Sequence, residues 1–279
     1  MDPATSSAPQ SQDIDWARLD PRTVVIATPQ RAWVADTAPA DRQPARASIA
    51  TTRKLLDGAI ALAQRQTPAA EPPPPLSPLR WLWRLAGYYQ LTRATPRLMA
   101  EAADRFLAAG EPELAAWAAE KAHEEQGHDR LALRDIAALG YDAERVVIAL
   151  VPEPAVALVG RFTAYVRRTD PLACVGYAHT LERLALEVRR PEIDAVQALL
   201  PAGVDATRCM RVHSGIGSDA AHVDDNVALI AALPPHRRAV VIAAVHETAT
   251  LCMRPPPGGH VTDDAIARAI SVTSSHQLH

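Results

Sequence analysis

The segment His-Glu-Glu-Gln-Gly-His at 123–128 combines carboxylates and imidazoles at a spacing that can bind a metal ion. On a continuous helix, Glu125 and His128 lie one turn apart on the same face, and Glu124 flanks that face. Helix-bundle proteins supply iron or manganese with ligands in this arrangement. Gly127 would cost such a helix roughly 1 kcal/mol relative to alanine and would leave room beside His128. The competing interpretation is a solvated charged face, so the metal hypothesis needs further ligands.

A further carboxylate, Glu182, falls in an apolar stretch between Leu172 and Leu186. Burying an unpaired carboxylate is costly, so a buried Glu182 would need a metal ion or Arg183 as its partner. A Glu182–Arg183 pair at the surface is an equal alternative. His179, one turn earlier, is expected either to reach substrate or metal or to pack between helices.

The spacing of Glu125 and His128 recurs later in the chain, where Asp219 and His222 form a second carboxylate-x-x-imidazole pair. His213 precedes this pair, and the glycines between them would bend or break a helix. On an unbroken helix His213 would point roughly opposite to His222, so it joins the same site only if the backbone unwinds. Capping of the next helix by Asp219 competes with metal binding.

Taken together, three carboxylates and two or three imidazoles favour two iron or manganese ions over structural zinc. Other residues are candidates for supporting roles. Asp135, two turns after His128, could orient a ligand imidazole, although an exposed acid beside Arg134 is the favoured interpretation. Glu124 is a reserve ligand, and Tyr165 is a candidate pocket residue.

Helices must position these residues, because nearly every periodic segment has apolar residues at helical spacing and strand-like alternation is almost absent. The predicted fold class is therefore all-α, a bundle of about seven to nine helices with an irregular N-terminal extension. A single helix is expected from Glu111 to Leu139, between Gly110 and Gly140.

Composition along the chain predicts four segments. Residues 1–12 are expected to be disordered, and 13–78 to form an extension with one helix and a proline-rich linker. Residues 79–254 should form the main domain, and 255–279 a loosely ordered tail with one short helix near Asp263 to Ile270.

The overall charge and composition exclude several classes of partner. A formal net charge of -3 argues against broad binding to nucleic acid or anionic lipid. The sequence contains no apolar run of about 18 residues, no signal-peptide pattern and no paired cysteine motif, so a soluble cytoplasmic protein is expected. Because two-fold dimers are the commonest soluble oligomers, we expect a homodimer.

Three segments, Ala122 to Gly140, Gly176 to Arg183 and Arg211 to Asp224, resemble the haem-oxygenase-like di-iron oxidases and oxygenases, also described as iron-containing redox enzymes. The resemblance covers roughly residues 79–254. It implies a haem-oxygenase-like helical fold that binds no haem, two iron ions with manganese as an alternative, and O2 as co-substrate. It also implies a small-metabolite substrate that undergoes amine N-oxygenation, oxidative C–C cleavage or desaturation, as in a biosynthetic pathway.

The resemblance also implies a ligand set, which is Glu125, His128, Glu182, His213, Asp219 and His222. Five residues separate His213 from Asp219, where the family more often has three, and this difference bears mainly on His213. Two alternatives remain open. One is a cofactor-independent enzyme on the same fold, related to quinone synthases or thiaminases, with acid–base groups or a cysteine nucleophile. The other is a non-catalytic helical binding protein.

Overall fold

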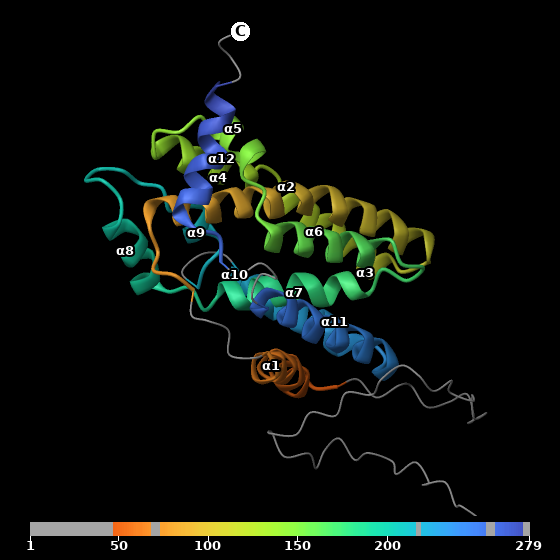
Figure 1. Ribbon diagram of the computed structural model, residues 1–279. Coiled ribbons are helices and arrows are strands. Elements are labelled where there is room, and N and C mark those ends of the chain that lie inside the picture. Colours follow the sequence, from red (N-terminus) through yellow and green to blue (C-terminus); the bar gives the residue numbers. More distant parts are fainter. Residues whose placement is uncertain (1–46, 68–72, 216–218, 255–259, 276–279) are drawn as a thin grey trace, which may run out of the picture.

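The computed structural model describes residues 47–67, 73–215, 219–254 and 260–275, and within these ranges the chain is all-helical, with no strand (Figure 1). The predicted fold class is therefore confirmed. The expected disordered N-terminus and most of the proline-rich linker lie outside the described residues. The helices are α1 (Ile49–Gln66), α2 (Pro78–Ala108), α3 (Pro112–Glu124), α4 (Asp129–Ala138), α5 (Ala143–Ala149), α6 (Glu153–Val166), α7 (Ala173–Ala185), α8 (Arg190–Ala198), α9 (Arg208–Val212), α10 (Asp219–Ala232), α11 (Pro235–Met253) and α12 (Asp263–Ser275).

The described part of the chain contains more helices than the expected seven to nine. The run from Glu111 to Leu139 divides into α3 and α4, and helices at both ends join the main body. α1 packs against α10 and α11, so it is not a separate extension. α12 packs against α2 and α5 and buries Ile266, which is 1% exposed. An apolar face of α12 is therefore covered, and the helix continues beyond Ile270, where the sequence led us to expect its end.

Helix α2 runs through the middle of the molecule and contributes to both of its hydrophobic cores (Figure 1). It has 31 residues, which corresponds to roughly 46 Å, and Ser77 caps its N-terminus by accepting a hydrogen bond from the backbone N–H of Arg80. The C-terminal half of α2 packs with α1, α3, α6, α7, α10 and α11 in a large core. The N-terminal half packs with α4, α5, α8, α9 and α12 in a small core. Two clusters of buried side chains therefore share one helix.

A close contact between α7 and α11 fixes the position of α7. A Cβ atom on Gly176 would lie 2.5 Å from the carbonyl oxygen of Val241, which no real Cβ tolerates. Thr180 donates its hydroxyl hydrogen to the carbonyl oxygen of Gly176 at 2.7 Å, so this polar side chain is satisfied within the helix. Because Gly176 packs this closely on α11, the position of α7 is fixed, and with it that of Glu182, six residues further along the helix.

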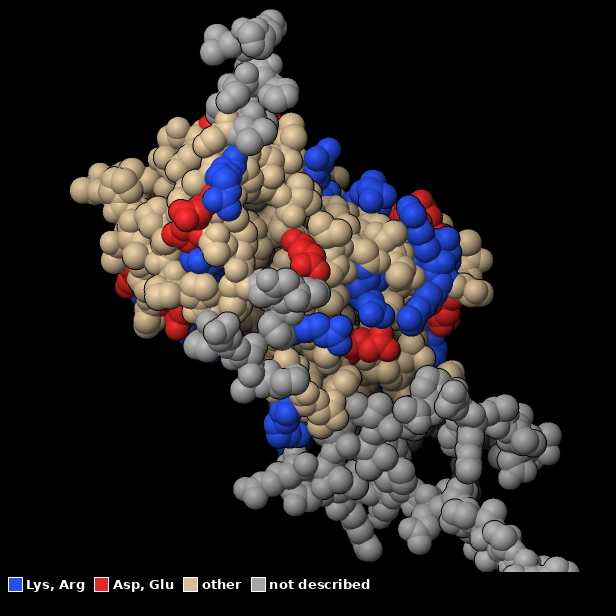
Figure 2. Space-filling view, in the orientation of Figure 1, with Lys and Arg blue, Asp and Glu red and all other residues tan. Residues whose placement is uncertain are grey.

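Basic and acidic side chains are interspersed on the face shown in Figure 2. Basic side chains gather on the right of that view, in the region that α2 and α6 occupy in Figure 1. Several arginines in these helices have acidic partners: Arg167 lies 3.1 Å from Glu101, and Arg161 lies 3.2 Å from Glu247. Such pairs reduce the positive potential of the surface around them.

Among the described residues, no single helix is long and apolar enough to cross a membrane. The bent pair α5 and α6, which meet at 79°, passes that test of length and composition only when the two helices are joined. Both helices bury apolar side chains in the cores, including Val146 of α5 and Phe162 of α6. Core packing therefore accounts for their apolar composition.

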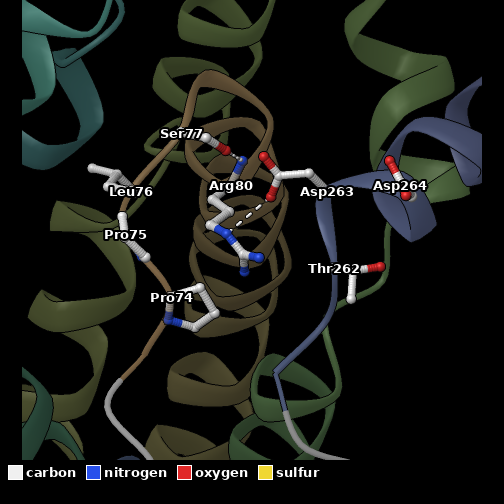
Figure 3. Close-up of a pocket in the computed structure, with 8 residues that line it drawn as sticks. All are labelled: Pro74, Pro75, Leu76, Ser77, Arg80, Thr262, Asp263 and Asp264. Carbon is white, nitrogen blue, oxygen red and sulfur yellow. Dashed lines mark hydrogen bonds and ion pairs between the residues drawn. The ribbon is translucent and has the colours of Figure 1, made fainter.

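A groove of about 420 Å³ lies between the start of α2 and the start of α12 (Figure 3). Arg80 crosses it, donating to the carbonyl oxygen of Val261 at 2.7 Å and pairing with Asp263 at 2.9 Å. The guanidinium is therefore already partnered, and its contacts join α12 to α2. None of the predicted metal ligands lines this groove.

Candidate metal centre

The first predicted ligand pair lies at a break between two helices rather than within one. α3 ends at Glu124, α4 begins at Asp129, and Gly127 between them has a φ of 83°. A side chain at Gly127 would meet nothing within 4 Å, so the position needs glycine for its left-handed backbone and not for space. This corrects the expectation that Gly127 sits inside a helix and makes room for His128.

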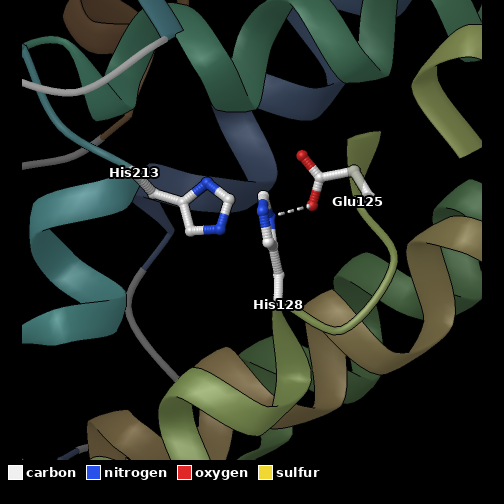
Figure 4. A group of neighbouring side chains, drawn as sticks. All are labelled: Glu125, His128 and His213. Atoms are coloured by element: carbon white, nitrogen blue, oxygen red, sulfur yellow. Dashed lines mark hydrogen bonds and ion pairs between the residues drawn. The ribbon is translucent and has the colours of Figure 1, made fainter. Parts of the chain in front are cut away.

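The break brings Glu125, His128 and His213 together, and we call this group the His/Glu triad (Figure 4). The Nδ1 atom of His128 lies 3.1 Å from a carboxylate oxygen of Glu125, and the ring centroids of His128 and His213 are 4.8 Å apart. In the described ranges, one ligand atom from each residue lies within 4.8 Å of the other two. Donor atoms that share one ion at about 2.1 Å lie roughly 3 to 4 Å apart, so small side-chain rotations suffice.

His213 is positioned through a buried carboxylate on a different helix. His213 follows the last residue of α9, and Asp135 of α4 is fully buried against that helix. Asp135 accepts hydrogen bonds from the Arg208 side chain at 3.0 Å and from the backbone N–H of Cys209 at 2.9 Å. The favoured expectation of an exposed Asp135 beside Arg134 is therefore wrong, because this carboxylate ties α9 to α4.

The residues after His213 are held just as closely. The backbone N–H of Gly215 donates to the carbonyl oxygen of Val188 at 3.0 Å. A Cβ atom at Gly215 would lie 2.6 Å from the carbonyl oxygen of Leu186, so glycine allows this close approach. His213 is thus fixed on both sides, by α4 before it and by the end of α7 after it.

The surroundings of Glu125 favour its ionised form. Burial raises the pKa of this carboxyl group, but the hydrogen bond with His128 and the charges of His213, His128 and Lys121 outweigh that effect, so its pKa is lower than usual. An ionised carboxylate is the form that binds a cation, so Glu125 is prepared for a ligand role.

The triad adjoins a mostly apolar cavity of about 260 Å³. Glu125 and His213 line one part of its wall together with Lys121 and Glu182. Elsewhere the wall includes Phe162 and Tyr177, whose rings stack at 4.4 Å with an interplanar angle of 10°. The remaining lining residues are Tyr88, Leu91, Thr92, Thr95, Met99, Ala178, Leu181, Ala185, Val188, Cys209 and Met210. This arrangement offers an apolar chamber with a few convergent polar groups.

Glu182 does not join the triad. One of its carboxylate oxygens lies 3.3 Å from the Nζ atom of Lys121, and the other accepts a hydrogen bond from the side-chain amide of Asn226 at 2.5 Å. Arg183 pairs with Asp57 of α1 instead, at 3.0 Å. The alternative of a Glu182–Arg183 surface pair is therefore wrong, and the partner of Glu182 comes from α3.

Lys121 also lies 3.0 Å from Glu124, whose other oxygen is 3.4 Å from the Nε2 atom of His222. We call the group of Lys121, Glu124, Glu182, His222 and Asn226 the lysine cluster. It contains three of the predicted site residues, Glu124, Glu182 and His222, but both of its carboxylates pair with an ammonium group.

Three other predicted residues have different positions. The hydroxyl of Tyr165 donates to Glu247 at 2.6 Å and does not line the cavity, which corrects its assignment as a pocket residue. His179 is 1% exposed, is absent from the cavity lining and lies near the charges of α1, so it packs between helices. Asp219 begins α10, and its side chain lies outside the described part of the structure.

Two residues of the site were not predicted from the sequence, namely Lys121 and Asn226. Lys121 lies four residues before Glu125, and a helix places such residues on one face. It is also flanked by Ala118 and Ala122, which mark a face that packs closely. Those signals were present, whereas nothing local indicates that Asn226 contacts Glu182.

No protein-family model matches the sequence, and no curated protein matches it either. A solved structure from Shewanella denitrificans, a domain of unknown function with a heme oxygenase-like fold, superposes with a TM-score of 0.55. The match covers 82% of this chain and 92% of that one, at 18% identity. The chain has a haem-oxygenase-like fold. This confirms the predicted architecture, and at such low identity the similarity concerns the fold alone.

The described side chains, which do not include that of Asp219, fit one metal ion better than two. Two imidazoles and one carboxylate converge in the His/Glu triad, which is a suitable donor set for one ion. Glu124, Glu182 and His222 do not form a comparable set, since the ammonium of Lys121 lies between the two carboxylates. A second ion therefore does not fit the lysine cluster as it is built.

Proposed function

We propose that this protein is a non-haem iron-dependent oxidoreductase that uses O2 to oxidise a small, largely apolar metabolite. The observation that carries the proposal is the meeting of two imidazoles and one carboxylate beside an apolar cavity. Amine N-oxygenation, oxidative C–C cleavage and desaturation are the reaction classes that we consider, in a biosynthetic role.

Glu125, His128 and His213 would hold the iron. A set of two histidines and one carboxylate leaves coordination positions open, and iron held in this way supplies the activation of O2. Manganese is the alternative, because the same ligands bind it. The second iron expected from the six-ligand set stays a prediction. Glu182 and His222 of that set belong to the lysine cluster, where Lys121 pairs with Glu182.

The residues around the cavity bind the substrate and exclude water. Its volume of about 260 Å³ lies just below the range of about 300 to 1,000 Å³ that is usual for drug-sized ligands, which favours a small metabolite. The stacked rings of Phe162 and Tyr177 offer a flat apolar surface to a substrate. Burial raises the pKa of the Tyr88 phenol, so this side chain stays neutral and can donate a hydrogen bond.

The structure gives less support to a cysteine nucleophile, which the cofactor-independent alternative would use. Cys209 lines the cavity, but burial and the nearby carboxylates Asp135 and Glu125 raise the pKa of its thiol well above the usual range. The thiolate is the reactive form, so this cysteine is a poor nucleophile.

Metal binding is the decisive test. The purified protein is loaded with Fe(II) without oxygen and desalted, and its iron is measured by mass spectrometry before O2 uptake is followed. We expect bound iron and O2-dependent absorption in the wild type, and loss of both in His128→Ala, because the triad then lacks a ligand. His236→Ala, at an exposed position on α11, is the matched control. Absence of iron from the wild type, or full iron retention in His128→Ala, would contradict the proposal.

A further inference from the structure

Lys121 is a buried cation held between carboxylates of two helices. Its side chain is 6% exposed, and its Nζ atom lies 3.0 Å from Glu124 of α3 and 3.3 Å from Glu182 of α7. It also lines the cavity, beside Glu125 of the triad. A lysine is almost never this buried unless it is paired, so the carboxylates account for its position.

The choice of lysine at this position is unusual for this sequence. The chain has only two lysines, Lys54 and Lys121, against 27 arginines. Lys54 is exposed on α1. An ammonium is a compact point charge, whereas a guanidinium is a wide planar fork that needs more room. The one buried lysine therefore stands where a small cation, similar in its contacts to a metal ion, is required.

The charges around the site support the same conclusion. Three carboxylates belong to the two groups of residues, those of Glu124, Glu125 and Glu182. One divalent ion in the triad and the ammonium of Lys121 together balance them. A second divalent ion added to this arrangement would have to approach an ammonium, and the described side chains of the two groups leave no carboxylate charge to offset that repulsion.

The oxygens of Glu182 are also held in place. Its second oxygen accepts from the amide of Asn226, and the amide oxygen of Asn226 in turn accepts from the indole N–H of Trp117 at 2.8 Å. The amide therefore presents its NH2 group to Glu182. The carboxylate is engaged on one side by the ammonium and on the other by this fixed donor.

We propose that Lys121 takes the place of a second metal ion, so that this protein binds a single divalent ion in the His/Glu triad. The proposal rests on the proposed function, because it requires the triad to bind metal. The ammonium pairs with both Glu124 and Glu182, so neither carboxylate is available to a second ion. Replacing Lys121 with an uncharged residue of similar length frees both carboxylates to bind a second ion together with His222.

Metal stoichiometry tests the proposal. Wild-type protein and Lys121→Met are titrated with Fe(II) without oxygen, and iron per chain is measured after desalting. We expect about one iron in the wild type and about two in Lys121→Met, because the freed carboxylates attract a divalent ion. Lys54→Met should match the wild type, since that side chain lies on the surface. The double variant Lys121→Met, Glu182→Gln should return to about one iron.

A second measurement does not depend on desalting. Co(II) titration followed by visible absorption should give one binding step in the wild type and a further step in Lys121→Met. Without metal, Lys121→Met should also melt at a lower temperature, because the two carboxylates then lack the ammonium that pairs with both of them. Added metal should therefore raise its melting temperature more than that of the wild type. If Lys121→Met does not fold, the number of irons per chain is measured in Lys121→Gln instead, where we also expect about two, against about one in the wild type.

The outcomes separate this inference from the proposed function. Two irons of similar affinity in the wild type would overturn the role of Lys121 but leave an iron enzyme. One iron in the wild type, in Lys121→Met and in Lys121→Gln would also overturn it alone. No iron in the wild type would overturn the proposed function and this inference together.

Discussion

The His/Glu triad and the lysine cluster adjoin each other on one cavity wall, but the protein builds them in different ways. The triad residues come from helix ends, with Glu125 and His128 on either side of a break and His213 just after α9. The residues of the lysine cluster all lie within helices: Lys121 and Glu124 in the last turn of α3, Glu182 in α7, and His222 and Asn226 in α10. The triad therefore depends on backbone turns, and the lysine cluster depends on helix packing.

The two groups also differ in what satisfies their polar atoms. In the lysine cluster every carboxylate has a cation or amide partner from another part of the cluster, as in the contact of Lys121 with Glu182. In the triad, two imidazoles approach one carboxylate. A closed set of partners stabilises the fold, whereas convergent ligand atoms are suited to binding an ion. Similar residue types therefore form a closed set of partners in one group and a convergent set of ligand atoms in the other.

Removing Asp135 should have the largest effect, because it separates the triad from its support. Asp135→Ala leaves Arg208 and the backbone N–H of Cys209 without their buried acceptor. We expect a loss of about 3 to 5 kcal/mol in the free energy of unfolding. Iron affinity should fall by about 10- to 100-fold, since α9, which ends beside His213, is no longer tied to α4. Urea denaturation and iron titration measure the two effects.

Asp104→Ala, at an exposed position on α2, is the control for Asp135→Ala and should change stability by less than about 0.5 kcal/mol. If Asp135→Ala keeps wild-type iron affinity, then α9 does not position the triad, and the contrast between the two groups fails at that point.

Acid should weaken the packing of α7, the helix that carries Glu182. Burial lowers the pKa of His179 to about 4, against 6.5 for an exposed histidine, while Asp57 acts to raise it and Arg183 and Arg53 act to lower it further. The folded protein thus disfavours the charged imidazole. The stabilisation is complete above about pH 6.5 and is lost as the pH falls towards 4, by roughly 3 kcal/mol.

The measurement is the free energy of unfolding of wild type and His179→Leu between pH 7 and pH 4. The variant has no imidazole to titrate, so its stability should fall less over that interval, and the difference isolates His179 from other groups. His236→Leu serves as an exposed control. Parallel curves for the wild type and His179→Leu would mean that His179 binds a proton equally well in the folded and unfolded states, which would contradict this prediction.

The sequence predicted the helical class well, because periodic apolar residues report directly on helices. The limits of the helices were harder to predict. A glycine inside a helix costs only roughly 1 kcal/mol, so the pattern around Gly127 allows both a continuous helix and a break. The break decides the site, because it places Glu125 and His128 at two helix ends.

The partners of charged residues were predicted less well than the helices that carry them. Glu182 was compared with its neighbour Arg183, but its cation is Lys121, far away in the sequence. Asp135 was expected beside Arg134 at the surface, but its partner Arg208 belongs to another helix. Such pairs depend on how helices pack, which local spacing does not specify. His213 joined the predicted set only through the resemblance and the glycines that follow it.

The helix break offers a smaller and more specific test of the triad. Gly127→Ala places a Cβ on a backbone with a φ of 83°, which should cost about 1 to 2 kcal/mol in the free energy of unfolding. Gly160→Ala, in the helical α6 with equally open surroundings, should be neutral or stabilising by up to about 1 kcal/mol. Chemical denaturation of both variants gives the comparison. Equal effects would contradict the role of the left-handed backbone, because both positions have open surroundings and only Gly127 has a positive φ.

The smallest expected effect concerns the fixed amide of the lysine cluster. Trp117→Phe removes the indole N–H that binds the amide oxygen of Asn226, and should cost about 1 kcal/mol in the free energy of unfolding. Trp83→Phe, on the partly exposed side of α2, controls for the loss of ring volume. Iron affinity of the triad should stay within about two-fold of the wild type, because the change acts on the partner of Glu182 and not on a triad ligand. A ten-fold loss of iron affinity in Trp117→Phe would mean that Glu182 contributes to the bound ion. The lysine cluster would then be part of the metal site, and the two groups would act as one.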